Sequence, residues 1–172
     1  MQLVSTVGFS IFESMLEAGE MDWDQVTFRT LQGGEVDNII SFVKNWLKDH
    51  PKGEIYVGTD SKARGSRVKY SSVVCLWDVG HGVWEAYANF WLPRPNDRHT
   101  RLWHEVTFSV KVAEKLKELG NIHVHKDYNS DPKFPSYQLY DAGIGLVNSM
   151  GFQGAGKPDA WAATSGANRH CQ

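Results

Sequence analysis

The sequence predicts an α/β fold built on a mixed sheet of five strands flanked by helices. Two observations lead to this prediction. Residues 54–92 contain three strand-like segments separated by short turns, a pattern typical of an antiparallel meander. Beyond residue 98, helical and strand-like segments alternate. Strands joined through a helix run parallel to each other, so the later strands should extend the meander as parallel strands.

Each element has its own local signal. Pro51 and Gly53 end the first helix, and Phe108, Val112 and Leu116 form an apolar stripe along the longest one. The expected elements are, in order, a helix at 35–50, strands at 54–60, about 67–77 and about 83–92, a helix at 99–119, a strand at 122–127, a helix at 136–150, a strand at 152–155 and a helix from Ala160.

Length and composition indicate one domain with an appendage. A chain of 172 residues can build a single sizeable core, and we divide it into an N-terminal extension at 1–34 and a domain at 35–172. Its two cysteines, Cys75 and Cys171, do not form a disulfide framework or a C-x-x-C pattern. Without a signal peptide or a membrane-length apolar run, we expect a cytoplasmic protein that does not contact membranes.

Four acidic residues stand at positions that suggest a site. Asp60 breaks the pattern of the first strand, and Glu105 lies three residues before Phe108, on the inward side of the long helix. Asp127 ends the fourth strand, and Asp159 precedes the last helix. Asp60, Asp127 and Asp159 each also fit an ordinary role in a turn or helix cap, whereas a buried glutamate is rare without a partner.

Acidic residues gathered on one core repel each other and need a cation between them. Oxygen ligands without cysteine suit Mg²⁺ or Mn²⁺ rather than zinc. Two such ions can activate water and stabilise the leaving oxygen in phosphodiester hydrolysis. They would also explain how a chain with a net charge of -2 binds nucleic acid, because the overall charge offers no attraction to a polyanion.

Several segments resemble the YkuK-type family of ribonuclease H-like proteins, over about residues 35–170. They are Val57-Gly58-Thr59-Asp60-Ser61, Arg101-Leu102-Trp103-His104-Glu105-Val106 with Ser109, His125-Lys126-Asp127-Tyr128-Asn129, and Gly151-Phe152 with Lys157-Pro158-Asp159-Ala160-Trp161-Ala162-Ala163. The resemblance implies a ribonuclease H-like fold. By analogy it also implies that Asp60, Glu105, Asp127 and Asp159 are catalytic metal ligands. Residues 1–34 lie outside it, and Lys62 stands where a glutamine is expected in many relatives.

Other polar residues are candidates for supporting roles or for a rival site. His125 can orient a water or a carboxylate, and Asn129, Lys157, Lys62 and Arg101 are candidates for contacts to substrate or to the acids. His123, His125 and Asp127 alternate along one strand, which is also compatible with a zinc, copper or iron site. His104 is expected at the surface or rim.

Basic and aromatic residues suggest how a nucleic acid is held. Two basic groups, one at 62–69 and one at 94–101, can bind phosphates or simply face solvent. Tyr70, Trp91 and Trp103 can stack on bases, and Trp91 and Trp103 can equally well be packing residues.

These features predict a metal-dependent nuclease that hydrolyses RNA or DNA by a two-metal mechanism, with Asp60 bridging two Mg²⁺ or Mn²⁺ ions. The alternative is a non-catalytic ribonuclease H-like module that binds nucleic acid or protein. Convergence of the four carboxylates would favour the enzyme, and exposure of Asp159 or Glu105 to solvent would favour the module. The choice between RNA and DNA, endo- or exonuclease action and the oligomeric state stay open.

Overall fold

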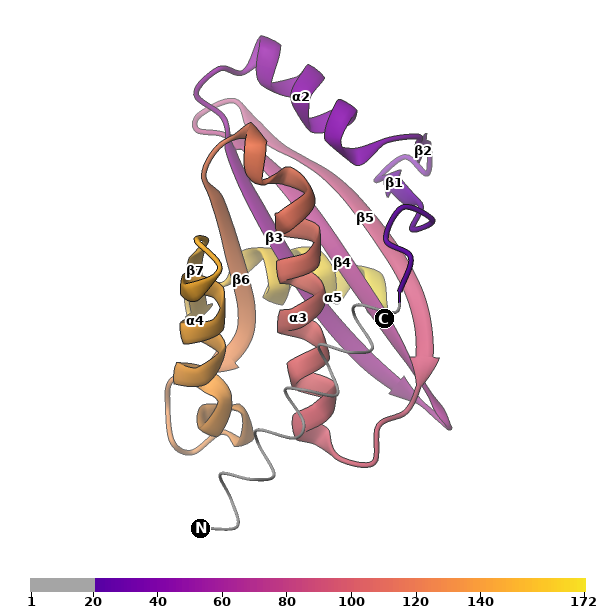
Figure 1. Ribbon diagram of the computed structural model, residues 1–172, viewed down its shortest axis with the longest axis vertical. Coiled ribbons are helices and arrows are strands. Elements are labelled where there is room, and N and C mark those ends of the chain that lie inside the picture. The colour runs from indigo at the N-terminus through magenta and orange to yellow at the C-terminus, as the bar shows by residue number, and fades with distance from the viewer. Residues whose placement is uncertain (1–20) are drawn as a thin grey trace.

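The predicted meander forms the middle of the sheet in the computed structural model, which describes residues 21–172. Its strands are β3 (Glu54–Arg64), β4 (Arg67–Asp78) and β5 (Gly82–Pro93), and β4 pairs antiparallel with both β3 and β5. β3 and β4 pair along their whole length and turn at Gly65, whose φ of 59° lies in the left-handed region that favours glycine. The three strands are long and lie side by side across the molecule (Figure 1).

The sheet has seven strands rather than the five that the sequence predicts, in the order β2-β1-β5-β4-β3-β6-β7. The two additional strands, β1 (Phe28–Thr30) and β2 (Glu35–Val36), extend the sheet beyond β5. Segments of two or three residues are too short to show an alternating pattern. The sequence therefore places residues 35–36 in the helix expected at 35–50, which begins only at Ile39. The mixed α/β architecture itself is as predicted.

The other edge of the sheet is parallel. β6 (Ile122–Asn129) pairs with β3, and β7 (Gln153–Lys157) pairs with β6, each after a helical crossover. The pairing of β3 with β6 ends at Gly58 and His125, and the register of β6 against β7 shifts beyond His125. The carboxyl ends of β3 and β6 are therefore unpaired with each other, which is where open α/β sheets usually bind ligands.

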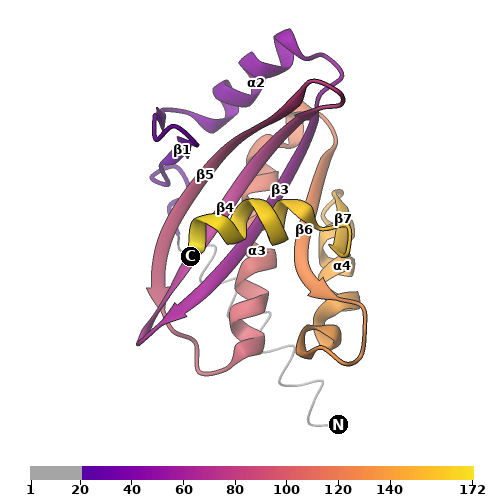
Figure 2. The same cartoon turned by 180° about the vertical axis from the view of Figure 1, so that it is seen from behind.

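Helices cover both faces of the sheet (Figures 1 and 2). On one face lie α3 (Arg98–Leu116), which a 3₁₀ turn extends to Leu119, and α4 (Tyr140–Ser149), which follows a 3₁₀ helix at Pro135–Leu139. α2 (Ile39–Asp49) packs at one end. On the opposite face the chain crosses β3 and β4 as a π-helix (Ala162–Ala167) that continues into α5 (Asn168–Cys171). Within the described residues, no helix has the length and hydrophobicity that a membrane span requires.

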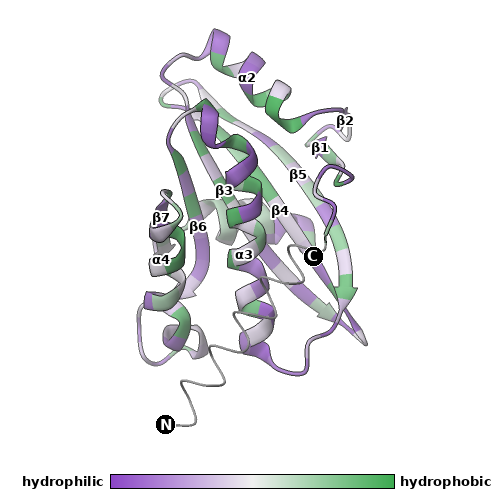
Figure 3. Ribbon diagram, in the orientation of Figure 1, coloured by the Kyte–Doolittle hydropathy of each residue, from purple (hydrophilic) through white to green (hydrophobic). Residues whose placement is uncertain are grey.

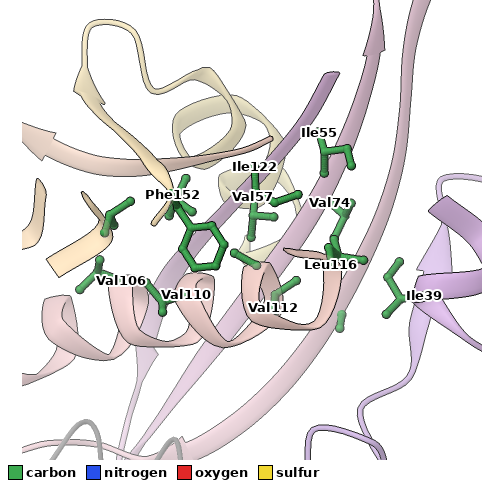
Figure 4. Close-up of a cluster of buried hydrophobic side chains, with 14 of the residues drawn as sticks. Ile39, Ile55, Val57, Val74, Val106, Val110, Val112, Leu116, Ile122 and Phe152 are labelled. Atoms are coloured by element: carbon green, nitrogen blue, oxygen red, sulfur yellow. The ribbon is translucent and has the colours of Figure 1, made fainter. Parts of the chain in front are cut away.

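The main core lies between α3 and the sheet. α3 presents Val106, Val110 and Leu116 to Val57 and Ile122, and each of these five side chains is at most 5% exposed (Figure 4). Burial of this apolar surface is the principal force that fixes the helix on the sheet. Along β6, hydrophobic residues give way to hydrophilic ones toward the carboxyl end (Figure 3), where the pairing with β3 has ended.

The opposite face depends on a close approach of backbones. A Cβ atom at Gly58 would lie 2.6 Å from the backbone nitrogen of Ala163, which is closer than real Cβ contacts come. Glycine at this point of β3 therefore lets the π-helix rest directly on the strand, two residues before Asp60.

Candidate functional site

Three of the four predicted acids line one cavity where β3 and β6 separate. β3 contributes Asp60, β6 contributes Asp127, and Glu105 reaches the cavity from α3, which crosses the sheet at this level (Figure 1). The cavity volume is about 150 Å³. Three carboxylates that are distant in sequence thus meet because a parallel pairing ends and a helix spans the gap.

Glu105 is the most enclosed of the three acids, with only 4% of the residue exposed. Its Oε1 accepts a hydrogen bond from the Ser61 hydroxyl at 2.5 Å, whereas Oε2 is buried without a hydrogen-bond partner in the described structure. Burial, followed by the negative charge of Asp60, raises the pKa of Glu105 well above its usual range. The helical spacing correctly predicted that this side chain points inward.

Asp60 is held from two sides. Its Oδ1 accepts the backbone N–H of Ser61 at 2.8 Å, and its Oδ2 lies 3.5 Å from the Sγ of Cys171 in α5. Burial raises the pKa of Asp60, and the charge of Asp127 raises it further. Burial and the neighbouring Asp60 raise the pKa of Cys171 to about 12, so the sulfur stays a thiol that can donate to the carboxylate.

The sequence predictions missed two neighbours of the acids. Ser61 follows Asp60 in the strand, and its hydroxyl reaches α3 because alternate side chains point to opposite faces. This placement could have been read from the strand pattern. Cys171 gave no such signal, because its contact with Asp60 spans 111 positions of sequence.

Cations sit around the same cavity. The Nζ of Lys157 lies 2.6 Å from Oδ1 of Asp127, an ion pair that lacks the geometry of a directed hydrogen bond. Arg101 also lines the cavity, and its charge lowers the pKa values of Asp60 and Glu105, though less than burial raises them. Asn129 completes this set at the end of β6. Three of the predicted supporting residues are therefore present at the cavity.

Three other predicted residues lie elsewhere. Asp159 is exposed and does not line the cavity. Lys62 donates to the side-chain oxygen of Gln172 at 2.5 Å. His125 is buried beside Tyr56 and Trp161 on the face that the π-helix covers, and its Nδ1 accepts the backbone N–H of Ala162 at 3.1 Å.

The rival histidine site lacks support in the geometry. His123 stacks on the Tyr56 ring with centroids 4.5 Å apart, and burial lowers the pKa of His125 to about 4. The backbone contact of His125 occupies one of its ring nitrogens. In residues 21–172, no three His, Cys, Asp or Glu side chains converge closely enough to form a complete metal cluster. The carboxylates of Asp60, Glu105 and Asp127 line one cavity, but they are not close enough to each other to form such a cluster either.

Two expectations about residues of α3 and β4 need correction. His104, expected at the surface or rim, is 1% exposed, and its Nδ1 lies 2.8 Å from the Tyr70 hydroxyl. Tyr70 and Trp103 are likewise buried, so neither can stack on a base. The reason is that α3 is enclosed all around at this level: residues 102–110 are buried without exception. Trp91 is 40% exposed, and the Arg67 guanidinium lies over its ring.

The sequence of this chain matches the model of a known family. A family model described as ribonuclease H-like matches residues 36–172. The chain belongs to the ribonuclease H-like family. The match confirms the resemblance to YkuK-type sequences. Comparisons with curated proteins and with solved structures give no match.

The ribonuclease H-like region begins within one residue of the predicted boundary at 35, and it contains all the acids and cations of the cavity. β1 precedes the matched residues but pairs with β5 of the same sheet. Residues 28–30 of the predicted extension are therefore structurally continuous with the matched region. Residues 1–20 lie outside the described part of the chain.

Proposed function

We propose that this ribonuclease H-like protein is a metal-dependent nuclease that hydrolyses phosphodiester bonds of RNA or DNA. One observation carries the proposal: Asp60, Glu105 and Asp127 line a single cavity, and Glu105 presents a buried oxygen without a hydrogen-bond partner among the described residues. Burying negative charge without a matching cation is costly, and sites that bear such a cost tend to be functional.

The donor set suits a hard divalent cation. The three carboxylates offer oxygen ligands. Burial is the main cause of the raised pKa values of Asp60 and Glu105, with a smaller contribution from the neighbouring acids, and a bound cation would favour their charged forms. We infer that these three residues hold Mg²⁺ or Mn²⁺. Asp159, the fourth ligand that the family resemblance implies, remains a prediction, since it is exposed outside the cavity.

In the mechanism we propose, Asp60, Glu105 and Asp127 would hold the metal, which when bound would supply an activated water and stabilise the departing 3′ oxygen. The protein's own groups prepare this chemistry. The Ser61 hydroxyl holds one oxygen of Glu105, which leaves the other free to bind. Arg101 and Lys157 bring positive charge to the cavity and can hold the phosphate. Release of Lys157 from Asp127 would free that carboxylate as a ligand.

The test is cleavage of labelled single-stranded, duplex and hybrid oligonucleotides with Mg²⁺ or Mn²⁺. Wild-type protein should cleave at least one of them, and Asp60→Asn should abolish cleavage. Glu114→Gln is a matched control for changes at Glu105, because Glu114 lies on the same helix but pairs with Lys111 away from the cavity. An unchanged rate in Asp60→Asn would refute the proposal.

A second candidate is a non-catalytic module that binds nucleic acid. The exposure of Asp159 and the ion pair between Lys157 and Asp127 favour it, because both leave the carboxylates short of a full ligand set. This candidate predicts that wild-type protein and Asp60→Asn bind oligonucleotides equally and that neither cleaves them. The cleavage assay with a parallel binding measurement separates the two.

A further inference from the structure

A second hollow adjoins the carboxylate cavity and shares two of its walls. It has a volume of about 220 Å³ and is lined by the loop after β5 and the first turns of α3. Arg98 and Arg101 line both hollows. The two spaces are therefore neighbours along one path that leads from Arg94, at the far side, to the acids.

Three arginine side chains line this path, and their positive charges are available to bind an anion. Neither Arg98 nor Arg101 forms an ion pair within the part of the chain that the structure describes, and the Nε of Arg101 is buried without a hydrogen-bond partner. The Arg94 side chain donates a hydrogen bond to the backbone oxygen of Gly65 at 3.4 Å. The one acid in the hollow, Asp97, is engaged as the cap of α3 through the backbone N–H and the hydroxyl of Thr100. Guanidinium groups of this kind match phosphate oxygens.

An exposed aromatic ring stands at the other end of the path. Phe134 lines the carboxylate cavity just before the 3₁₀ helix, and it is 48% exposed. Exposure of a large apolar ring to water is unfavourable, but the ring offers a flat surface on which a nucleobase can stack. Its place beside Asp127 and Asn129 puts such a base next to the acids.

We propose that this path binds a single-stranded nucleic acid, with backbone phosphates on Arg94, Arg98 and Arg101 and one unpaired base on Phe134. The proposal rests on the proposed nuclease function and names its substrate class. A paired base cannot reach Phe134, because its faces are covered by neighbouring bases in the duplex. Single-strand binders combine the same two elements, a positive groove and an aromatic stacking platform.

The experiment measures binding rather than cleavage, by fluorescence anisotropy of the wild-type protein with EDTA present. The probes are labelled oligo(dT) and oligo(rU) of about 12 nucleotides, an abasic oligonucleotide of equal length and a blunt duplex. Oligo(dT) or oligo(rU) should bind more tightly than the duplex. Phe134→Ala should weaken this binding about tenfold and leave the abasic probe unchanged. Arg98→Ala should weaken all single-stranded probes alike and lower the salt dependence by about one counterion.

Tyr137→Ala is the matched control, because Tyr137 lies on the 3₁₀ helix that follows Phe134 and is 42% exposed, but does not line the cavity. Both Phe134 and Tyr137 are exposed, so their removal leaves the core intact. Preference for the duplex, or equal binding by Phe134→Ala and wild type, would overturn the proposal.

The result is separable from that of the nuclease proposal. Phe134-dependent binding without metal-dependent cleavage would refute the nuclease and keep this binding path. Metal-dependent cleavage combined with binding that does not depend on Phe134 would keep the nuclease proposal and refute the binding path.

Discussion

Two buried glutamates lie on opposite faces of the sheet and differ in what surrounds their charge. Glu85 of β5 is 7% exposed and faces the C-terminal helix, where it pairs with His170 and, at 3.3 Å, with Arg169. Glu105 of α3 is 4% exposed, but its nearest partner is a neutral serine hydroxyl. The first glutamate contacts the Arg169 guanidinium and the His170 ring, whereas the second has an oxygen without a hydrogen-bond partner among the described residues.

The surroundings of Glu85 show what a structural role requires. His170 stacks on Tyr87 with ring centroids 3.7 Å apart, so the partner of Glu85 is itself fixed in place. This anchor holds α5 on the sheet, and the next residue, Cys171, contacts Asp60. The comparison teaches that burial alone does not mark a functional acid. The useful sign is burial combined with an unmatched charge.

The largest effect should come from removing the charge of Glu105. In Glu105→Gln, the Ser61 hydroxyl can still donate to the amide oxygen, so the fold is kept while the proposed metal ligand is lost. We expect cleavage to fall by about a thousandfold, equivalent to about 4 kcal/mol of transition-state stabilisation. Single-turnover rates with Mn²⁺ measure this loss. Glu114→Gln should cleave at the wild-type rate. A similar fall in both variants would show that Glu105 has no special role in cleavage.

Removal of Glu85 should instead affect stability. Glu85→Ala leaves His170 buried without its partner and should lower the free energy of unfolding by about 3 kcal/mol. Urea denaturation monitored by tryptophan fluorescence measures the change. Protein that remains folded should still cleave, although more weakly if α5 loosens beside Asp60. A wild-type stability would show that Glu85 does not anchor the helix.

Added cation should stabilise only the site around Glu105. A ligand that binds the folded state alone stabilises it by about 2.7 kcal/mol at one hundred times its Kd. Titration with Mn²⁺ in a thermal melt should therefore raise the Tm of the wild type and of Glu85→Ala, and not that of Glu105→Gln. Equal shifts in all three proteins would place the cation elsewhere.

The smallest expected effect is on the pH dependence of the metal-free protein. The folded-state pKa of Glu105 is raised, so the folded state holds this proton more tightly than the unfolded chain does. Its stability therefore falls as the pH rises through the raised pKa, and Glu105→Gln should lack this fall and be more stable at neutral pH by about 1 kcal/mol.

His104 and His125 contribute the opposite slope. Burial lowers the pKa of each to about 4, so they lose stability as the pH drops below the ordinary histidine range. The difference between the wild type and Glu105→Gln, measured by urea denaturation at several pH values, isolates the glutamate. A difference that stays constant with pH would contradict the raised pKa.

The sequence predicted those features that depend on local repetition. The apolar stripe of α3 is fixed by helical spacing, and the same spacing placed Glu105 inside. The meander followed from alternation and short turns. These signals are local, because each side chain's direction follows from its neighbours in one element.

Features that depend on packing between distant elements were not predicted. His104 was expected at the surface or rim, but Tyr70 of β4 closes over that side of α3. The cavity itself arises where the pairing of β3 with β6 stops. The residues of the two strands do not indicate, from the sequence, where that pairing ends. Phe134 had no pattern to distinguish it, and only its position beside the cavity reveals it.

Three buried hydroxyl groups form a chain of hydrogen bonds, and the direction of each bond in the chain depends on the others. Ser109 lies 2.9 Å from the carbonyl oxygen of Glu105 and 2.8 Å from Thr59, which lies 2.8 Å from Ser72. Each hydroxyl has a single hydrogen to donate. If Ser109 gives its hydrogen to the helix carbonyl, Thr59 must donate to Ser109 and Ser72 to Thr59. One carbonyl of α3 thereby sets the direction of three hydrogens across β3 and β4.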